Sequence, residues 1–366
     1  MNRGAASADR FTEEPRGTGA LRFCRVEGVS RLTGTYARIA ELPLEIEDYR
    51  LERLEAPVTR DFIRVTTLVR LVGGGEEGLG EDVTWYAEAH DRELAAGPSR
   101  PLSGAWILES FSSALEIEEP HKRWAYESAA LDLALRQAGR SLAEALGRTP
   151  RPVTFVVSPG LGDPPSAEPL RRRLELYPEL RFKLDPGSGW TDELVQELAA
   201  TGTVDIVDYK AFYSDPDAAP PDVPLYRRVA EGFPEAWLED PALTGETEEV
   251  LRPHRDRITW DAPIHSVADV EDLAFPPRTL NVKPSRFGFV RELLDFYDYC
   301  AAHAIDLYGG GMFELGPGRG QIQHLASLFN PDGPNDVAPG GYNEREPRPG
   351  LPPSPLPAAS NDAGFR

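Results

Sequence analysis

Beyond residue 150 the chain alternates short apolar strands with polar helical segments, and this alternation constrains the fold more than any other feature. Strict alternation of buried strands with helices indicates a parallel sheet, and seven or eight such units favour a closed barrel. An open, doubly wound sheet is the structural alternative, although no Gly-x-Gly-x-x-Gly follows the first strand to support dinucleotide binding. The seven expected strands span residues 153–157, 180–184, 204–208, 236–239, 258–261, 279–283 and 306–309.

The first 150 residues follow a different pattern. Residues 62–72 are rich in β-branched side chains, and the turn Gly73-Gly74-Gly75 leads to a third expected strand of a meander within residues 45–86. From residue 124 apolar side chains recur at three- and four-residue spacing, which indicates an amphipathic helix. The sequence therefore predicts an α/β protein in which a smaller α+β unit precedes the barrel.

The charge balance limits the class of partner. Asp and Glu number 60 against 39 Lys and Arg, so the net charge is −21 and the surface repels nucleic-acid phosphates. No apolar run is long enough for a membrane span, and the N-terminus lacks the apolar segment of a secretory signal. The two cysteines, Cys24 and Cys300, are too few for a disulfide framework and fit reduced thiols in a cytoplasmic protein.

Five consecutive predicted strands have an ionisable residue at or next to their last position, namely Lys183, Asp208, Glu239, Asp261 and Lys283, which are 25, 31, 22 and 22 residues apart. Since the carboxyl ends of barrel strands converge at one mouth, these side chains would share a small cavity. A single acid at a strand end is more often a helix cap or a surface charge, but the combination favours a functional centre. Clustered carboxylates repel one another, and a divalent cation relieves that repulsion; ligands that are all oxygen select Mg²⁺.

Three motifs lie at these strand ends: Trp237-Leu-Glu-Asp-Pro-Ala-Leu, Asn281-Val-Lys-Pro-Ser-Arg-Phe-Gly and Gly309-Gly-Gly-Met-Phe-Glu-Leu-Gly-Pro-Gly-Arg-Gly. They resemble signatures of the enolase superfamily, in its muconate-lactonizing subgroup (the mandelate racemase/muconate lactonizing enzyme family), and the resemblance covers residues 45–330. It implies a (β/α)7β TIM-like barrel with an N-terminal α+β capping domain. The expected organisation is a polar tail (1–20), the capping domain (21–148), the barrel (149–330) and a Pro/Gly-rich segment (331–366) that packs on the cap or is disordered.

The resemblance also implies roles for the strand-end residues. Asp208, Glu239 and Asp261 become the Mg²⁺ ligands, and Lys183 and Lys283 become opposing acid/base groups.

Arg181 stands where the family has the first lysine of Lys-x-Lys. By strand alternation its side chain is expected to face the interior beside Lys183. Since arginine does not readily release a proton, the expected role of Arg181 is that of an electrostatic helper. Arg181, Lys283 and the metal are together expected to lower the pKa of Lys183, which then acts as a base near neutral pH.

Two departures from the family pattern concern the expected metal site. Where the family has Asp-x-Asn, this chain has Asp208-Tyr209-Lys210, which puts a cation near the metal. The fifth strand ends in Asp261-Ala262 rather than Asp-Glu, which removes an outer carboxylate but no ligand. In a competing register Asp185 is the first ligand; we prefer Asp208, because Asp185 would require an extra strand–helix unit before the sixth strand.

The implied function is Mg²⁺-dependent abstraction of the proton α to a carboxylate, through an enediolate intermediate, with a lyase or isomerase outcome. The reaction would resemble that of o-succinylbenzoate synthase or muconate cycloisomerase. A racemase of amino-acid derivatives and a dipeptide epimerase stay open, although Asn335-Asp336-Val337 does not match the Asp-x-Asp of the epimerases cleanly. A barrel that binds a carboxylate or metal without turnover also stays open, and Lys210 and Ala262 favour it.

The expected partner is a small-molecule carboxylate, with no nucleic acid and no membrane. Related barrels often associate, so the resemblance includes a homo-oligomer among its expectations. Residues 32–36 or 57–61 are candidates for loops that cover the barrel mouth.

Overall fold

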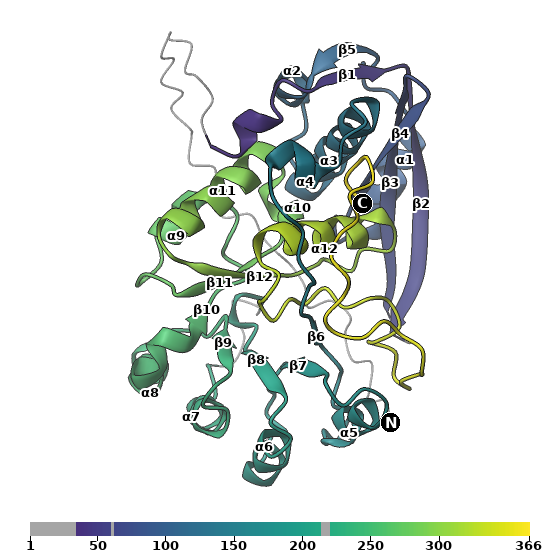
Figure 1. Cartoon of the computed structure of the whole chain (residues 1–366). Helices are drawn as coiled ribbons and strands as arrows, with labels where there is room; N and C mark the ends of the chain where they lie inside the picture. Colours follow the sequence, from purple (N-terminus) through teal and green to yellow (C-terminus); the bar gives the residue numbers. More distant parts are fainter. Residues whose placement is uncertain (1–33, 60–61, 214–219) are drawn as a thin grey trace.

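The structure is a computed structural model that describes residues 34–59, 62–213 and 220–366. Figure 1 shows a cap built from the N-terminal strands and helices, and a barrel whose strands and outer helices follow along the chain. The predicted polar tail 1–20, Cys24 and the start of the candidate loop 32–36 lie outside the described residues. Within the described ranges, no helix has both the length and the apolar character needed to cross a membrane.

The cap is an α+β unit, as the sequence predicts. β2 (Asp48–Thr59), β3 (Phe62–Gly73) and β4 (Glu76–Asp82) form the expected antiparallel meander in that order. A second antiparallel pair joins β1 (Pro43–Ile46) to β5 (Gly104–Ile107). The described helices of the cap are the 3₁₀ helix η1 (Tyr36–Arg38), α1 (Ala87–Ala96), α2 (Leu108–Ala114), α3 (Pro120–Gln137) and α4 (Leu142–Leu146).

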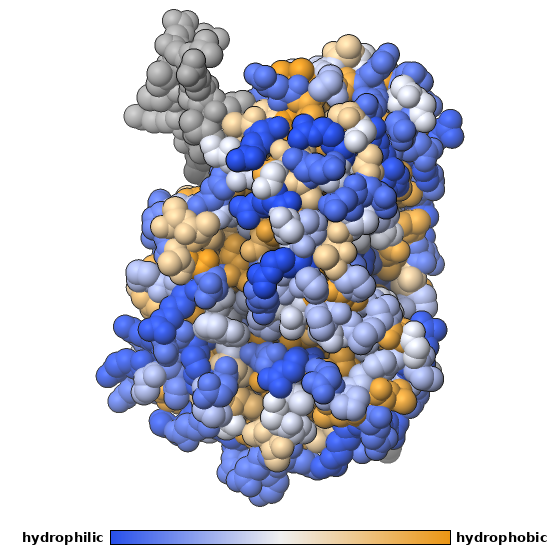
Figure 2. Space-filling model, in the orientation of Figure 1, coloured by the Kyte–Doolittle hydropathy of each residue, from blue (hydrophilic) through white to orange (hydrophobic). Residues whose placement is uncertain are grey.

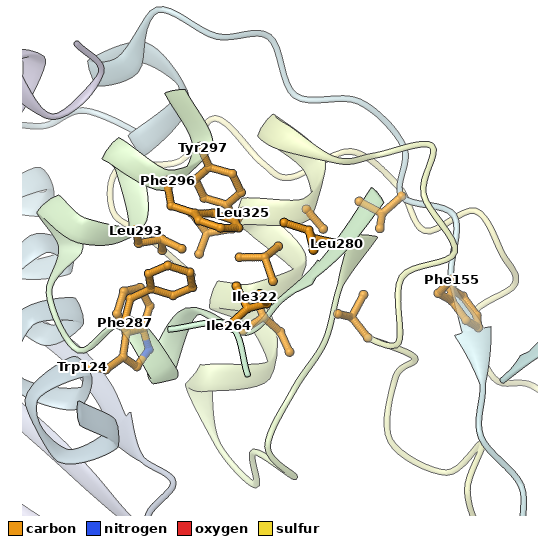
Figure 3. Packing of buried hydrophobic residues seen from close by; sticks show 14 of the residues in the cluster. Trp124, Phe155, Ile264, Leu280, Phe287, Leu293, Phe296, Tyr297, Ile322 and Leu325 are labelled. Atoms are coloured by element: carbon orange, nitrogen blue, oxygen red, sulfur yellow. The ribbon is translucent and has the colours of Figure 1, made fainter. Parts of the chain in front are cut away.

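Helix α3 packs directly on the backbone of β4. An ideal Cβ on Gly80 would come within 1.9 Å of the Ala125 carbonyl oxygen, and one on Gly78 within 2.1 Å of the Ala129 oxygen. These two positions therefore require glycine, because any larger residue would push the helix off the strand. Most of α3 is buried as a result, and Trp124 on this helix lies beside Phe287 and the other apolar residues of the barrel helices in Figure 3.

The barrel is closed, so the open-sheet alternative is wrong. β6 to β10 pair in parallel in chain order, β11 pairs in parallel with β12, and Asn281 N donates to Trp260 O at 3.0 Å between β10 and β11. All seven predicted strands are confirmed: β6 (Val156–Val157), β7 (Arg181–Leu184), β8 (Val204–Asp208), β9 (Trp237–Glu239), β10 (Ile258–Thr259), β11 (Thr279–Val282) and β12 (Asp306–Gly309).

A two-residue segment supplies the eighth strand. Asp336 makes a parallel bridge to Gly310 next to β12, and Asn335 makes one to Phe155 next to β6. The barrel therefore extends beyond residue 330, and the predicted boundary at that residue is too early. The segment is surrounded by Pro, Gly and Asn, and only its two partner strands identify it as a strand.

Helices cover the outside of the barrel, and many begin with a side chain that caps them. Thr191 accepts from the Leu194 amide at the start of one helix, and Asp222 from the Leu225 amide at the start of the next. Figure 2 shows hydrophilic residues over most of the visible face, with apolar residues scattered among them. The described helices of this part are α5 (Glu168–Leu176), α6 (Asp192–Ala199), η2 (Ala211–Tyr213), α7 (Val223–Gly232), α8 (Gly245–Leu251), η3 (Arg252–Arg257), α9 (Val267–Glu271), α10 (Pro284–Phe287), α11 (Val290–Ala302) and α12 (Pro317–Phe329).

The cap and the barrel are joined at the first turn of α12. Glu81, at the end of β4, is 1% exposed, and its carboxylate accepts from the backbone amides of Leu315 (2.6 Å), Gly316 (2.9 Å) and Gly318 (3.0 Å). A carboxylate at this position satisfies amides that have no partner within the helix and complements the helix dipole. The cap therefore holds the loop that follows β12, and that loop borders the barrel mouth.

The C-terminal segment packs on both parts of the molecule, so of the two expectations for residues 331–366 packing is the one observed (Figure 1). Leu356 bridges Val153 in antiparallel fashion just before β6. Phe365 is fully buried against Trp124, and its amide donates to Asp132 Oδ1 on α3 at 2.7 Å. The last residues therefore return to the cap.

Candidate metal and acid–base centre

The five ionisable strand-end residues meet at one mouth of the barrel. Lys183 lies on β7, Asp208 on β8 and Glu239 on β9, while Asp261 and Lys283 follow β10 and β11. The three carboxylates are at most 1% exposed, and Lys183 is 3% exposed. Charges so removed from water require partners of opposite sign or a bound ion, and each has a charged partner here.

Lys183 is the most buried of the lysines at this centre. Its Nζ lies 2.5 Å from Glu239 Oε1, 3.0 Å from Asp208 Oδ2 and 3.9 Å from Asp336 Oδ2. Burial by itself lowers the pKa of this lysine, but the surrounding carboxylates outweigh burial and raise it well above its ordinary value. The expectation of a lowered pKa is therefore wrong for the chain alone, because the nearest charges are negative.

Arg181 is the predicted site residue that the structure separates from the others. Its guanidinium forms an ion pair with Asp205 and donates to the Gly202 carbonyl at 2.7 Å, and its side chain is 38% exposed. The β7–β8 pairing is irregular between Phe182 and Lys183, and Asp205, near the start of β8, is the residue left out of register. The prediction that the Arg181 side chain faces the interior beside Lys183 is therefore wrong. Arg181 instead pairs with Asp205, near the start of the neighbouring strand.

Lys283 belongs to a second group of contacts, centred on Asp261. Lys283 Nζ donates to Asp261 Oδ2 at 2.7 Å, and Arg286 donates to Oδ1 at 2.8 Å. Tyr213 OH donates to Oδ2 at 3.2 Å. Burial raises the pKa of Asp261, but Arg286 and Lys283 outweigh it and hold the pKa well below its usual range. The two lysines therefore contact different carboxylates of one centre.

Three carboxylates form a compact group at this centre. Single carboxylate oxygens of Asp208, Glu239 and Asp240 all lie within 4.8 Å of one another, and all three side chains are buried. Asp240 has a left-handed φ of 48°, and its two oxygens accept from the amides of Asp261 (2.8 Å) and Ala262 (2.9 Å). Asp240 thereby holds the backbone that carries Asp261, which was the predicted third ligand and lies outside this compact group.

Glu239 is fully buried, and each of its carboxylate oxygens accepts from a side chain. Tyr308 OH donates to its Oε2 at 2.5 Å from β12, opposite Lys183 on Oε1. Burial and repulsion from Asp208 and Asp261 raise the pKa of Glu239 well above its ordinary value in spite of Lys183. Asn281 Oδ1, also buried, has no hydrogen-bond partner among the described residues. Burial and mutual repulsion thus raise the pKa values of Glu239 and Asp240, and the ligand atoms at the centre are oxygens, which is the ligand set of a hard divalent cation such as Mg²⁺.

The structure also separates the two candidates for the first ligand. Asp208 is buried in the centre, whereas the Asp185 side chain is 53% exposed and its nearest described cation is Lys210, at 3.4 Å. Burial raises the pKa of Asp208, but Lys183 and Lys210 outweigh it and lower the pKa below its usual range.

Sequence reasoning did not select four residues that contact the centre: Tyr213, Asp240, Arg286 and Tyr308. Asp240 and Arg286 stand inside the motifs that had been recognised, directly after Glu239 and three residues after Lys283. Tyr308 lies on the predicted seventh strand, two residues before Gly310, and strand alternation could have marked it as facing inward. Tyr213 follows β8 in a short 3₁₀ helix, and no local signal identified it.

A pocket of about 440 Å³ opens beside Lys183. The loops after β6 and β7 line it, with Ser158, Gly160, Asp185, Gly187 and Trp190 among its residues. The pocket therefore connects the acidic centre with solvent on the β6–β7 side of the mouth.

Aromatic side chains join the cap to another part of the mouth. Phe62 of β3 stacks on Trp85 with ring centroids 5.1 Å apart, and both meet Phe313, which follows β12, at 6.3 and 6.2 Å. The described residues next to the candidate loop 57–61 therefore contact the barrel loop at the end of β12.

Comparisons with known proteins agree with this architecture. Residues 37–145 match the N-terminal domain, and residues 149–344 the C-terminal domain, of a family described as a domain of unknown function (DUF8230). The chain is 29% identical to the N-succinylamino acid racemase of Amycolatopsis sp. over 325 residues, which cover 81% of this chain and 86% of that protein. It is 27% identical to the o-succinylbenzoate synthase of Geobacillus kaustophilus over 316 residues, covering 78% and 81% of the two chains.

The fold is shared with a solved structure described as a member of the enolase superfamily from Listeria innocua Clip11262. That structure has a TM-score of 0.60 and 22% sequence identity, and the match covers 81% of this chain and 86% of the other. The relatives and the solved structure match this chain over most of its length, which includes both the cap and the barrel. The chain belongs to the DUF8230 family, and it shares its fold with a member of the enolase superfamily.

Proposed function

We propose that the protein is a Mg²⁺-dependent enzyme that removes the proton α to a carboxylate of a small molecule. The observation that carries this proposal is the pairing of two lysines with different carboxylates of one buried centre: Lys183 with Glu239 and Asp208, and Lys283 with Asp261. The names of the relatives support a lyase or isomerase outcome, as in o-succinylbenzoate synthesis or N-succinylamino acid racemisation. A cytoplasmic location and self-association belong to the same proposal.

Asp208, Glu239 and Asp261 would hold the Mg²⁺ ion. Asp240 is part of the compact carboxylate group, but both of its oxygens accept backbone amides, so its proposed role is to fix the turn that carries Asp261. When bound, the divalent cation supplies positive charge that stabilises the two negative charges developing on the substrate carboxylate.

The lysines perform the proton transfer. A lysine accepts a proton only when it is neutral, and the carboxylates around Lys183 hold it protonated in the chain alone. A cation held by Asp208 and Glu239 would offset the negative charge that raises the pKa of Lys183, so that Lys183 could release its proton and act as the base. Lys283, held by Asp261, is then the group that donates or accepts a proton on the other side of the substrate.

Deuterium exchange from solvent into a substrate carbon tests this mechanism. The wild type and the variants Lys183→Ala, Lys283→Ala and Lys122→Ala are incubated with Mg²⁺ and N-succinyl amino acids in D₂O, and exchange is followed by NMR. We expect each active-site variant to lose exchange, and Lys122→Ala, in the cap, to keep it. Exchange that persists in both Lys183→Ala and Lys283→Ala would refute the two-lysine mechanism.

A barrel that binds a carboxylate or metal without turnover is the second candidate, and the contact of Lys210 with Asp208 favours it. Calorimetric titration with Mg²⁺ separates the two when it is combined with the exchange assay. Metal binding that is lost in Glu239→Gln, without exchange in any carboxylate tested, would support the binding protein. Binding together with exchange supports the enzyme.

A further inference from the structure

Lysine is rare in this chain, and its distribution is uneven. Only four of the 39 basic residues are lysines, at positions 122, 183, 210 and 283. Three of the four lie after or within barrel strands at the acidic centre, while arginine carries the positive charge almost everywhere else. Lysine presents a compact ammonium on a flexible stem, whereas arginine presents a planar guanidinium. The third lysine at the centre, Lys210, has no role in the proposed proton transfer, so its presence there requires a separate explanation.

Lys210 contacts both oxygens of Asp208. Its backbone amide donates to Oδ1 at 3.0 Å, and its Nζ donates to Oδ2 at 2.7 Å, the same oxygen that lies 3.0 Å from Lys183. The backbone of Lys210 has a φ of 51°, in the left-handed region that a long side chain rarely adopts. Amides on either side of Lys210 hold this turn, since Tyr209 N donates to Glu239 O (2.9 Å) and Ala211 N to Asp240 O (3.1 Å). The turn therefore directs the ammonium back onto the proposed metal ligand.

A second carboxylate is within reach of the same ammonium. Asp185, after β7, has its Oδ1 3.4 Å from Lys210 Nζ. The Asp208 side chain is fully buried, the Lys210 side chain is 34% exposed, and the Asp185 side chain is 53% exposed. Lys210 thus lies between a buried acid inside the centre and an exposed acid at its edge, and its Nζ is within ion-pair distance of both.

We propose that Lys210 is an internal cation that competes with a divalent metal for Asp208, and that Asp185 receives its ammonium when the metal binds. This inference rests on the proposed function, because it takes Asp208 as a metal ligand. A metal held by Asp208 repels an ammonium at hydrogen-bond distance from the same carboxylate, so Lys210 must leave that position. Lys210 therefore weakens metal affinity, and Asp185 offsets part of that effect by stabilising the displaced side chain.

Calorimetric titration with Mg²⁺ alone tests the first half of the proposal. Lys210→Met removes the ammonium and keeps most of the side-chain length, and Lys122→Met is the matched control in the cap. We expect Lys210→Met to bind Mg²⁺ roughly tenfold more tightly than the wild type, since one partly exposed charged hydrogen bond no longer has to be broken. Lys122→Met should keep the wild-type affinity. Lys210→Asn provides a second variant, and thermal unfolding verifies that each protein is folded.

Asp185→Asn tests the second half, in two backgrounds. In the wild type we expect this substitution to weaken Mg²⁺ binding several-fold, and in Lys210→Met we expect no effect, because the ammonium that Asp185 receives is gone. An equal loss of affinity in both backgrounds would overturn the proposal and identify Asp185 as a ligand itself.

The remaining outcomes separate this inference from the function on which it rests. If the wild type binds Mg²⁺ and folded Lys210→Met and Lys210→Asn bind it equally or more weakly, the competition is refuted while the metal-dependent function stands. If neither the wild type nor folded Lys210 variants bind Mg²⁺, both the competition and the metal-dependent function fail.

Discussion

His324 on α12 connects the barrel to the C-terminal residues, and its burial has a measurable consequence for stability at acid pH. The side chain is 4% exposed, its ring lies 5.8 Å from that of Phe365, and its Nε2 has no hydrogen-bond partner among the described residues. Burial lowers the pKa of His324 from 6.5 to about 4, and among the described residues no acid offsets this effect.

The sign and size of the effect follow from proton linkage. Because the pKa is lowered in the folded state, the unfolded state binds the proton first as the pH falls, and stability present above pH 6.5 is lost toward pH 4. Between pH 7 and pH 5 this one group lowers the free energy of unfolding by about 2 kcal/mol. The size of this loss depends mainly on the pKa of His324 in the unfolded state, since at pH 5 the histidine of the folded state is still largely neutral.

The assay is urea unfolding of the wild type and His324→Leu at pH 7 and pH 5. We expect the loss of unfolding free energy between these two pH values to be about 2 kcal/mol smaller in the variant, because leucine has no proton to bind. Other groups titrate in the same range, but their contribution cancels in the difference between the two proteins. The reasoning is refuted if His324→Leu keeps the wild-type pH dependence.

Two further predictions concern the packing of the cap and the net charge. Gly80→Ala should lower the free energy of unfolding by about 3 kcal/mol, because its Cβ would press on the Ala125 carbonyl oxygen, whereas Gly245→Ala, where a Cβ meets nothing within 4 Å, should change it by less than about 0.5 kcal/mol. Urea unfolding measures both, and equal effects would contradict the close approach of α3 to β4. Raising the NaCl concentration from about 0.01 M to about 1 M should raise the melting temperature, since it shortens the Debye length from roughly 30 Å to roughly 3 Å and screens repulsion within a chain of net charge −21. A melting temperature that stays constant or falls would show that this repulsion does not limit stability.

Much of the architecture was predictable because it is encoded in local periodicity. Seven strands and the cap meander followed from apolar runs and their spacing, and each was found close to its expected residues. The eighth strand was not predictable, since Asn335 and Asp336 lie between Pro334 and Pro339 with Val337 as their one β-branched neighbour in that interval. Two residues become a strand there because Gly310 and Phe155 present hydrogen-bonding edges on either side.

In the candidate centre, too, some features could be predicted from the sequence and others could not. Lys183, Asp208, Glu239, Asp261 and Lys283 could be selected because barrel topology brings the ends of parallel strands together, whatever the side-chain conformations. Contacts within the centre were less predictable.

Arg181 was misplaced because strand alternation says nothing about which carboxylate lies nearest, and Asp205 on the adjacent strand engages its guanidinium. Asp240 was missed because its contribution depends on a left-handed φ that turns its carboxylate onto two amides of the next strand end.

The sequence by itself determined the order of the strands and helices, the residue types at the barrel mouth and the excess of acid over base. These depend on composition and on spacing along the chain. The tertiary structure alone decided the pairing of charges: Lys183 with Glu239, Lys283 with Asp261, and Lys210 with Asp208. The physical reason is that electrostatic interaction depends on distance through space and on burial, and both are set only when strands far apart in sequence close into one barrel.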